Sequence, residues 1–517
     1  MTTRPKTRPL QRIAALLLVW TVALAAAAVA AEPLADRIDA LVSKGALAQA
    51  KVGVLVERAG DGATLYARGA DQLFIPASNQ KILTVLASLV RFGPTHRFTT
   101  RTWAPQPIDG DGTVAELLVE GGGDPALGSE DWWRLAADLR REGLRHVSGN
   151  IRVDDSLFAG PSWHPSWGAL SARAYHAPVG ALSANYGAFV VSVWPRDATG
   201  SAPRVSVDPP VSYLRLRNLA RTVTRRRGDL LIDRMQGGAS EGRAEEIVRV
   251  EGTVRRGDAG DHFPRSVIDP GLYAGSLLLH QLRANAIEVD GEVRRAPRRA
   301  EEPLAIVLER PGRSLAEIAR LCLKHSSNAI AETLVKDLGA WDGVDATDRP
   351  ARAGDWPEGI AALRRTLAGL GVDLDRARLV DGSGLSIQNR LSPRMLVRAL
   401  RLGADSFVAG PEFVAALPIA HGDGTLERRL EAVAGRIRAK TGLLSDARVT
   451  ALSGFAERED GERLVFSILV NGPGGGTEAG MDAVDRIARA LVEAELPPAN
   501  GAPGAPPAAG ARAVGAD

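Results

Sequence analysis

The chain has 517 residues, 45% of them hydrophobic and 24% charged, which is typical of a globular protein too long for one hydrophobic core. Its formal charge of +3 becomes −1 over residues 32–517, where 60 basic residues face 61 acidic ones, because residues 1–31 hold four basic and no acidic residues. This near-neutral balance argues against nucleic-acid binding, and the single cysteine, Cys322, excludes an internal disulfide.

Residues 1–31 have the layout of a secretory signal peptide. A basic start is followed by a continuous apolar run that ends in small residues, with an A-x-A-like site at Ala28-Val29-Ala30. We expect cleavage near Ala30 or Ala31 and an exported, periplasmic protein. No later segment reaches the ~20 consecutive apolar residues of a membrane-spanning helix, so no stable membrane anchor is expected.

The two ends of the remaining chain predict one α+β domain. Residues 51–74 contain two strand-like runs around a Gly-Asp-Gly turn, which indicates a hairpin, and 76–89 (PASNQKILTVLASL) predicts an apolar helix. The pattern between 314 and 405 is mainly helical, and three strands follow before residue 472. Strands from both ends of the chain should therefore share one sheet that is covered by helices.

The middle of the chain differs in composition. From about 101 to 311 it is rich in Gly, Pro and Trp and has short alternating segments, which predicts a β-rich insertion of one or two domains. The last residues have too few apolar side chains to fold. The predicted organisation is thus a signal peptide (1–31), a first domain part (32–100), the insertion (101–311), a second domain part (312–496) and a disordered tail (497–517).

Three short motifs occur in order along the two parts of this domain. They are Ser78-Asn79-Gln80-Lys81, Ser326-Ser327-Asn328 and Lys440-Thr441-Gly442. A Ser-x-x-Lys alone is most often a capped helix with a solvated lysine. Together, however, the three match the Ser-x-x-Lys, Ser-x-Asn and Lys-Thr-Gly set of serine acyltransferases.

The expected chemistry follows from the first motif. Positions i and i+3 share a face of a helix, so the Lys81 amine can reach the Ser78 hydroxyl, which needs a base to act as a nucleophile. An amine is a base only when it is neutral, and burial together with a neighbouring cation, Lys440, should lower the pKa of Lys81. The oxyanion would lie between the backbone amides of Ser78 and Leu443.

The other two motifs complete the predicted site. Ser326 can relay a proton to the leaving amine, and Asn328 can hold the substrate amide or Lys81. Lys440 and Thr441 lie on a predicted strand whose open edge could pair with an extended peptide, and they would bind its terminal carboxylate. Gly442 would leave room for the substrate backbone to approach.

Other possible sites have less support. Asp381-Gly382-Ser383-Gly384 is favoured as a turn over direct chemistry. The eight histidines show no metal-ligand spacing, so no metal or other cofactor is expected.

Around these motifs the chain resembles the D-alanyl-D-alanine carboxypeptidase/endopeptidase family of low-molecular-mass penicillin-binding proteins with a large insertion. The resemblance spans about 32–495, and the 248 positions from Ser78 to Ser326 distinguish it from class A β-lactamases. The segments that carry it include PASNQKILT, GGGDPAL, VGALSANYGAFVVSV, DPGLYAGSLLLHQL, HSSNAIAE, LVDGSGLSIQNRLSP, HGDGTLERRL and RAKTGLL.

The resemblance implies a penicilloyl serine transferase fold interrupted by β-rich domains. It implies cleavage of peptidoglycan stem peptides or their cross-links through an acyl-enzyme, and covalent inhibition by β-lactams. Carried over by position, Ser78 is the nucleophile and Lys81 the proton acceptor, with Ser326 and Asn328 completing the catalytic set. Lys440, Thr441, Gly442 and Leu443 bind substrate, and Leu443 replaces a usually small hydroxylic residue.

Two alternatives remain open. A β-lactamase-like hydrolase would release its acyl group quickly, although no obvious deacylating glutamate is present. A catalytically silent wall-binding scaffold would use the insertion for binding, but such a protein has no reason to keep a lysine on an apolar helix.

Overall fold

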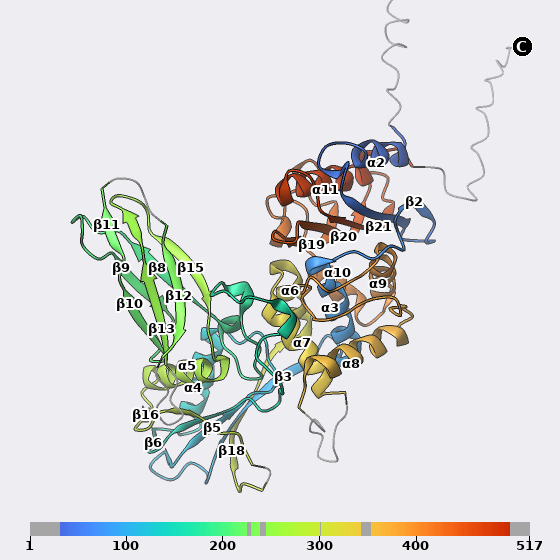
Figure 1. Ribbon diagram of the computed structural model, residues 1–517. Helices are drawn as coiled ribbons and strands as arrows, with labels where there is room; N and C mark the ends of the chain where they lie inside the picture. The colour runs from blue at the N-terminus through green and yellow to red at the C-terminus, as the bar shows by residue number, and fades with distance from the viewer. Residues whose placement is uncertain (1–31, 225–228, 238–244, 300, 343–352, 497–517) are drawn as a thin grey trace, which may run out of the picture.

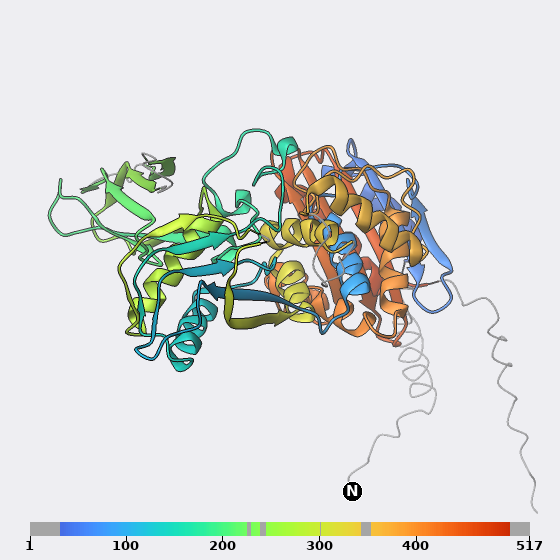
Figure 2. The same ribbon diagram turned by 90° about the horizontal axis from the view of Figure 1, so that it is seen from below.

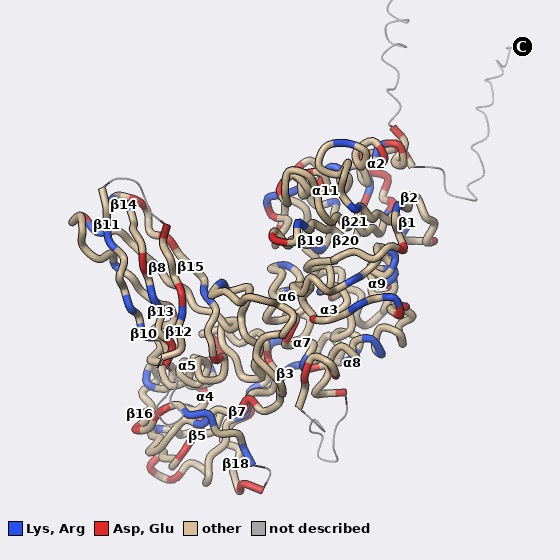
Figure 3. The backbone as a smooth tube through the Cα atoms, viewed as in Figure 1, with Lys and Arg blue, Asp and Glu red and all other residues tan. Residues whose placement is uncertain are grey.

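The computed structural model describes residues 32–224, 229–237, 245–299, 301–342 and 353–496. The predicted signal peptide and tail lie outside the described residues. The chain forms two lobes (Figures 1 and 2), one built from both ends of the sequence and one built from its middle. Acidic and basic residues are interspersed along the chain in both lobes (Figure 3).

A five-stranded antiparallel sheet organises the first lobe, in the order β19-β20-β21-β1-β2. The predicted hairpin is confirmed, and strand β1 pairs along its full length with β21, from Lys51 opposite Asn471 to Arg58 opposite Leu464. The strands are β1 (Lys51–Arg58), β2 (Thr64–Arg68), β19 (Ile437–Leu444), β20 (Val449–Glu457) and β21 (Arg463–Asn471).

Helices cover both faces of this sheet, which explains why its strands are almost continuously apolar. Alternate β21 residues point to opposite faces: Phe466 packs with α2 and α11, whereas Val465 packs with the larger helical group. The helices are α2 (Leu34–Val42) and α11 (Gly476–Glu493) on one face, and α3 (Gln80–Phe92), α6 (Leu315–His325), α7 (Asn328–Ala340), α8 (Trp356–Gly369), α9 (Pro393–Asp405) and α10 (Gly410–Ala416) on the other.

Helix α3 lies at the centre of the larger helical group. It contacts α6, α7, α8 and α9, and every residue from Gln80 to Leu89 is buried. A helix buried all round needs no polar face, which accounts for its apolar sequence. Lys81, in the first turn of this helix, therefore places an ionisable side chain in the interior of the lobe.

The insertion leaves and rejoins the first lobe through two adjacent strands. β3 (Arg97–Ala104) follows α3 and pairs antiparallel with β18 (Ala305–Ser314), so the predicted boundaries at 100/101 and 311/312 fall within these strands. The pair belongs to a five-stranded sheet, β17-β7-β5-β3-β18, with β5 (Leu117–Glu120), β7 (Ile151–Asp154) and β17 (Val293–Arg295). The pairing of β3 with β18 closes the long gap between the first and second motifs.

The rest of the insertion is made of smaller sheets and two helices. The β-rich character is as predicted, but α4 and α5 were not expected; both pack in a second hydrophobic core. The elements are α4 (Ser129–Arg141), α5 (Pro270–Ala284), and the sheets β16-β6-β4 (Glu288–Val289, His146–Val147, Thr113–Val114), β15-β8-β9 (Asp261–Ser266, Ala188–Trp194, Arg204–Asp208), β10-β13-β12 (Leu214–Asn218, Glu246–Glu251, Leu231–Gln236) and β11-β14 (Arg221–Val223, Thr253–Arg255).

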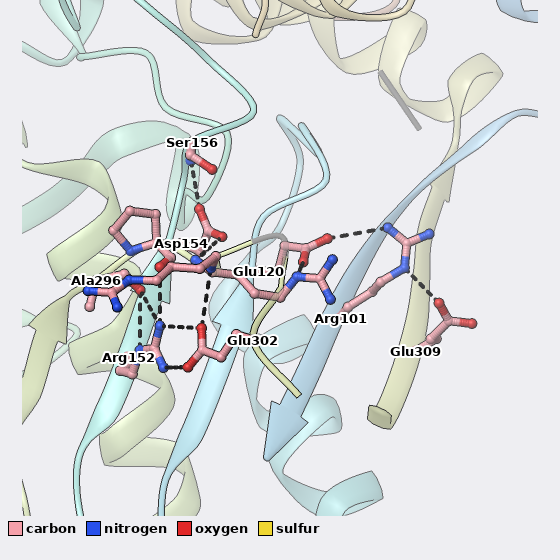
Figure 4. A network of polar contacts seen from close by, with 11 residues as sticks. Arg101, Glu120, Arg152, Asp154, Ser156, Ala296, Glu302 and Glu309 are labelled. Carbon is pink, nitrogen blue, oxygen red and sulfur yellow. Dashed lines mark hydrogen bonds and ion pairs between the residues drawn. The ribbon is translucent and has the colours of Figure 1, made fainter. Parts of the chain in front are cut away.

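A polar network ties the segment before β18 to the insertion sheet (Figure 4). Asp154 accepts hydrogen bonds from the amides of Ser156 (2.9 Å) and Arg298 (2.7 Å). Arg152 pairs with Glu302 and donates 3.1 Å to the Pro297 carbonyl. Because charges and backbone groups find partners here, we assign this network to holding the insertion together.

The alternation in β21 gives a stability prediction. Phe466→Ala removes a ring that is 0% exposed and should lower the free energy of unfolding of the first lobe by about 3–5 kcal/mol. Phe407→Ala is the matched control, because that ring is 96% exposed and its loss should change stability by less than about 0.5 kcal/mol. Denaturant titration followed by calorimetry measures both; equal losses would contradict the assigned core.

Candidate active site

Ser78 lies in a single 3₁₀ turn that leads into α3. The turn, Ala77–Asn79, is joined directly to Gln80–Phe92, and Ala77 has φ +48°. A positive φ in a non-glycine residue is strained and occurs where surrounding structure enforces it. Gly384 supplies that packing, because a Cβ there would lie 1.9 Å from the Ala77 carbonyl oxygen.

Lys81 is fully buried, and its amine has three hydrogen-bond acceptors. Nζ lies 2.9 Å from Ser78 Oγ, 2.7 Å from Asn328 Oδ1 and 2.8 Å from the Ser383 carbonyl oxygen. Two of these acceptors, the amide and carbonyl oxygens, can only accept. A neutral amine would donate its two hydrogens to them, which directs its lone pair at the Ser78 hydroxyl.

The electrostatics favour that neutral form. Burial lowers the pKa of Lys81 to about 8, and nearby Cys322, Glu332 and Asp381 act in the opposite direction. The sequence predicted two causes, burial and the neighbouring cation Lys440. Burial is the leading cause for both amines, and the pKa of Lys440 is itself held well below its usual value by burial and by Lys81. Desolvation is therefore what favours the neutral form of Lys81 that the predicted role as a base requires.

The second motif faces Lys81 from the junction of two helices. Ser326 ends α6 in the left-handed conformation (φ 57°), and its Oγ accepts a 2.9 Å hydrogen bond from Lys440 Nζ. Ser327 caps α7, and Asn328 is its first residue. The structure thus brings Ser78, Lys81, Ser326, Asn328 and Lys440 into one cluster, as the motifs predicted, although their roles in catalysis stay predictions.

The third motif lies on β19, at the edge of the sheet. The amide of Ala439 donates outward to Pro418 (2.9 Å), away from β20. Backbone direction alternates along a strand, so the Thr441 and Leu443 amides point to the same outer side. The backbone thus leaves an edge beyond Lys440 that an extended peptide could pair with, and it directs the Leu443 amide to that edge.

Gly442 has a different neighbour from the one expected. A Cβ at this position would lie 2.9 Å from Asn79 Nδ2 and 3.0 Å from the Pro76 carbonyl oxygen. The space predicted for the substrate backbone is therefore occupied by the turn that carries Ser78. Asn79 also donates 3.2 Å to the Lys440 carbonyl, so the first and third motifs are in direct contact.

The remaining two predicted binding residues differ in exposure. Thr441 is nearly buried and its hydroxyl lies 2.8 Å from that of Thr425, a residue the sequence analysis did not single out. Leu443 is 43% exposed. A branched apolar side chain therefore borders the strand edge, directly after the predicted carboxylate-binding residues.

The segment 381–384 contributes more than the favoured turn. It is a turn, in which Asp381 accepts hydrogen bonds from the amides of Gly384 (2.8 Å) and Ser386 (2.7 Å). Its Ser383 carbonyl nevertheless contacts Lys81 directly. Sequence reasoning could not assign this contact, because every residue type has a backbone carbonyl.

The insertion also reaches the site. Asn328 Nδ2 donates 2.9 Å to the Tyr175 carbonyl. A cavity of about 530 Å³ opens between the insertion and the α6–α7 junction, with a mostly apolar lining that includes Ser326, Asn328, Tyr175 and Tyr186. Within the described ranges, no three His, Cys, Asp or Glu side chains are grouped so that they could hold a metal ion.

Comparisons with known proteins found a matching family profile and similar chains. The profile of the D-Ala-D-Ala carboxypeptidase 3 (S13) family matches residues 34–494. A D-alanyl-D-alanine carboxypeptidase of Actinomadura sp. (strain R39) is 33% identical over 478 residues, which cover 89% of this chain and 84% of that protein. The D-alanyl-D-alanine carboxypeptidase DacB of Haemophilus influenzae is 24% identical over 420 residues, 77% of this chain and 80% of that protein.

Solved structures share the fold. Penicillin binding protein 4 of Haemophilus influenzae superposes with a TM-score of 0.72 at 21% identity, over 88% of this chain and 98% of that one. A predatory peptidoglycan endopeptidase of Bdellovibrio bacteriovorus gives 0.52 at 14% identity, over 87% and 94%. These likenesses establish the α+β fold with additional β-rich sheets.

The lowered pKa of Lys81 predicts the pH dependence of Ser78 reactivity. Only the neutral amine accepts a proton, so the rate of Ser78 acylation by benzylpenicillin should rise with pH and level off above the Lys81 pKa of about 8. Stopped-flow measurement of the acylation rate constant from about pH 6 to about pH 10 covers both the rising acidic limb and the plateau of this pH profile. A rate that does not change over that range would contradict Lys81 as the base.

Proposed function

Since the chain belongs to the D-Ala-D-Ala carboxypeptidase 3 (S13) family of serine enzymes, we propose that it removes the terminal D-alanine from peptidoglycan stem peptides through a Ser78 acyl-enzyme. The observation that carries the proposal is the buried Lys81 amine, which lies 2.9 Å from Ser78 Oγ and has two acceptors for its own hydrogens.

The proposed reaction begins at Ser78. Its Oγ attacks the carbonyl carbon of the penultimate D-alanine while Lys81 takes the hydroxyl proton. The Ser78 and Leu443 amides stabilise the oxyanion. The C–N bond then breaks as Ser326 donates its hydroxyl proton to the leaving amine and takes up the proton that Lys81 removed from Ser78. Water later attacks the ester carbonyl, which releases the shortened peptide as a carboxylic acid and returns a proton to Ser78 Oγ.

Substrate binding would use the outer edge of β19. An extended peptide can add to an open strand edge through backbone hydrogen bonds. Its terminal carboxylate would lie against Lys440 and Thr441, and a carboxylate near Lys440 would favour the charged form of that buried amine. The exposed Leu443 side chain beside this position would favour an apolar group on the substrate.

A second activity, DD-endopeptidase cleavage of cross-links, is also proposed. A cross-link places a bulky group on the leaving amine, so the site needs room beyond a single D-alanine. The cavity of about 530 Å³ next to Ser326 and Asn328 supports this proposal, because it could hold a group larger than one D-alanine. The Bdellovibrio protein that shares the fold is described as a peptidoglycan endopeptidase.

The two alternatives differ from the proposed enzyme in their reaction with a β-lactam. A β-lactamase-like hydrolase would release the penicilloyl group rapidly, and a silent scaffold would not be acylated. The scaffold is disfavoured by the buried Lys81, because desolvating an amine is unfavourable and a scaffold would not need it. Among the solved structures with this fold, penicillin binding protein 4 of Haemophilus influenzae has been obtained in complex with a β-lactam.

We propose that the enzyme acts outside the cytoplasm, in the periplasm, after cleavage near Ala30 or Ala31. The basic start, apolar run and small-residue site of this segment support export. Over the described residues, no helix is both long enough and apolar enough to cross a membrane.

The acyl-enzyme predicts a mass change. Intact mass spectrometry of the wild type with benzylpenicillin should give a single stable adduct of one drug molecule, and Ser78→Ala should give none. The wild type should release D-alanine from a pentapeptide and cleave a cross-linked dimer, both lost in Ser78→Ala. Drug consumption without an adduct would favour the β-lactamase, and neither reaction would favour the scaffold.

Export predicts a new N-terminus. Expression of the full chain in a bacterial host should yield a periplasmic protein that begins at Ala31 or Glu32 by N-terminal sequencing. A variant with Ala28 and Ala30 replaced by bulky residues should remain longer, because signal peptidase needs small residues there. A cytoplasmic protein that begins at Met1 would contradict the proposal.

A further inference from the structure

One fully buried carboxylate in the first lobe has no part in the proposed reaction. Glu332 lies one helical turn after Asn328 on α7, so the two side chains share a face of that helix. Its carboxylate accepts three hydrogen bonds: from the Gly382 amide (3.0 Å), the Ser383 amide (2.7 Å) and Trp356 Nε1 (2.8 Å). Two of these three donors belong to the loop that contacts Lys81.

The backbone amides of this loop and its Ser383 carbonyl point in opposite directions. The Gly382 and Ser383 amides point to Glu332, whereas the Ser383 carbonyl accepts from Lys81 Nζ at 2.8 Å. Thr84, from α3, donates 2.7 Å to the Gly382 carbonyl. The loop also packs closely on α7, because a Cβ at Gly382 would lie 2.7 Å from the Ala331 carbonyl oxygen.

Helix α7 therefore controls both acceptors of the Lys81 hydrogens. Asn328 supplies one directly, and Glu332 fixes the loop that supplies the other. If the Ser383 carbonyl moved away, one hydrogen of the neutral amine could point at Ser78. The amine lone pair would then point away from the Ser78 hydroxyl. Misplacement of this kind by about 1 Å can slow a reaction ~100-fold.

We propose that Glu332 is a positioning residue for acylation: it holds the Ser383 carbonyl against the Lys81 amine, so that the amine lone pair faces Ser78. This rests on the proposed function, in which Lys81 is the base. Glu332 does not contact the substrate or the reacting atoms. On the side away from the loop, Glu332 contacts Trp356, the first residue of α8. This contact by itself would indicate only a structural anchor.

The charge of Glu332 provides a second readout, beside the height of the acylation plateau. The charged or titratable groups around it are Lys81 on α3, Cys322 on α6, Lys336 on α7 and Asp381 in the loop. Burial, and next the charge of Asp381, raise the pKa of Glu332 to about 7. Above that pH its negative charge raises the pKa of Lys81, against the effect of burial. Removing the charge, or the carbonyl it positions, should therefore move the acidic limb of the acylation rate to lower pH.

The test is Glu332→Gln, which keeps the size of the side chain but replaces one acceptor by an NH₂ group that opposes the loop amides. With benzylpenicillin and active-site titration, the acylation plateau should fall about tenfold or more, and the limb should shift to lower pH. For D-alanine release from a pentapeptide, kcat should fall while KM stays within about twofold.

Trp356→Phe is the matched control, because it removes the third donor to Glu332 and leaves both loop amides bound. The acylation plateau of this variant and the pH of its acidic limb should stay as in the wild type. Thr84→Val removes the second support of the loop and should give a smaller change of the same kind as Glu332→Gln.

The outcomes separate the two levels of proposal. A wild type that is not acylated overturns the proposed function. If the wild type is acylated and Glu332→Gln has the same acylation plateau and pH dependence as Trp356→Phe, the positioning role is overturned. If Glu332→Gln does not fold, Thr84→Val decides: a lowered plateau with a shifted limb supports the role, and unchanged kinetics overturn it.

Discussion

The site depends on the burial of the Lys81 amine. Transfer of an ammonium group from water to a protein interior is strongly unfavourable unless it is neutralised or hydrogen-bonded. Here burial lowers the pKa of Lys81 to about 8, and each direction in which the amine could donate ends on an oxygen. Those oxygens come from the turn before α3, the start of α7 and the 381–384 loop, so one desolvated group requires three separate segments to meet.

The fold satisfies this requirement by surrounding α3. The sheet lies beside it, α6 to α9 pack around it, and the edge strand β19 contacts the turn that carries Ser78. The insertion leaves after α3 and returns before α6 through two paired strands, β3 and β18. Because those strands lie side by side, the 248 positions between Ser78 and Ser326 separate the motifs in sequence but not in space.

Two features of the site differ from what the sequence indicates, and in each case the cause is packing. Gly442 makes room for the Ser78 turn rather than for substrate. The 381–384 turn presents a carbonyl to the Lys81 amine while Glu332 binds its amides. The elements of the site thus support each other before any substrate binds.

Features that depend on local spacing can be derived from the amino-acid sequence alone. The i, i+3 relation of Ser78 and Lys81 and the opposite facing of successive side chains in β1 and β21 follow from the periods of helix and strand. The order of the three motifs is read directly from the chain. The amphipathic pattern of α4 is also present in the sequence, but a Gly- and Pro-rich region surrounds it and obscures it. Helix α5 is apolar on nearly all sides and so has no stripe to detect.

The surroundings of each group, in contrast, follow from contacts between segments that are distant along the chain. The partner of Lys81 in the loop is a backbone carbonyl, and the outward amide of Leu443 depends on how β19 pairs; neither has a residue-type signature. Glu332 appears in the sequence as one more helical glutamate. Its role in the site comes from long-range contacts and desolvation, which depend on distances between segments that are remote along the chain.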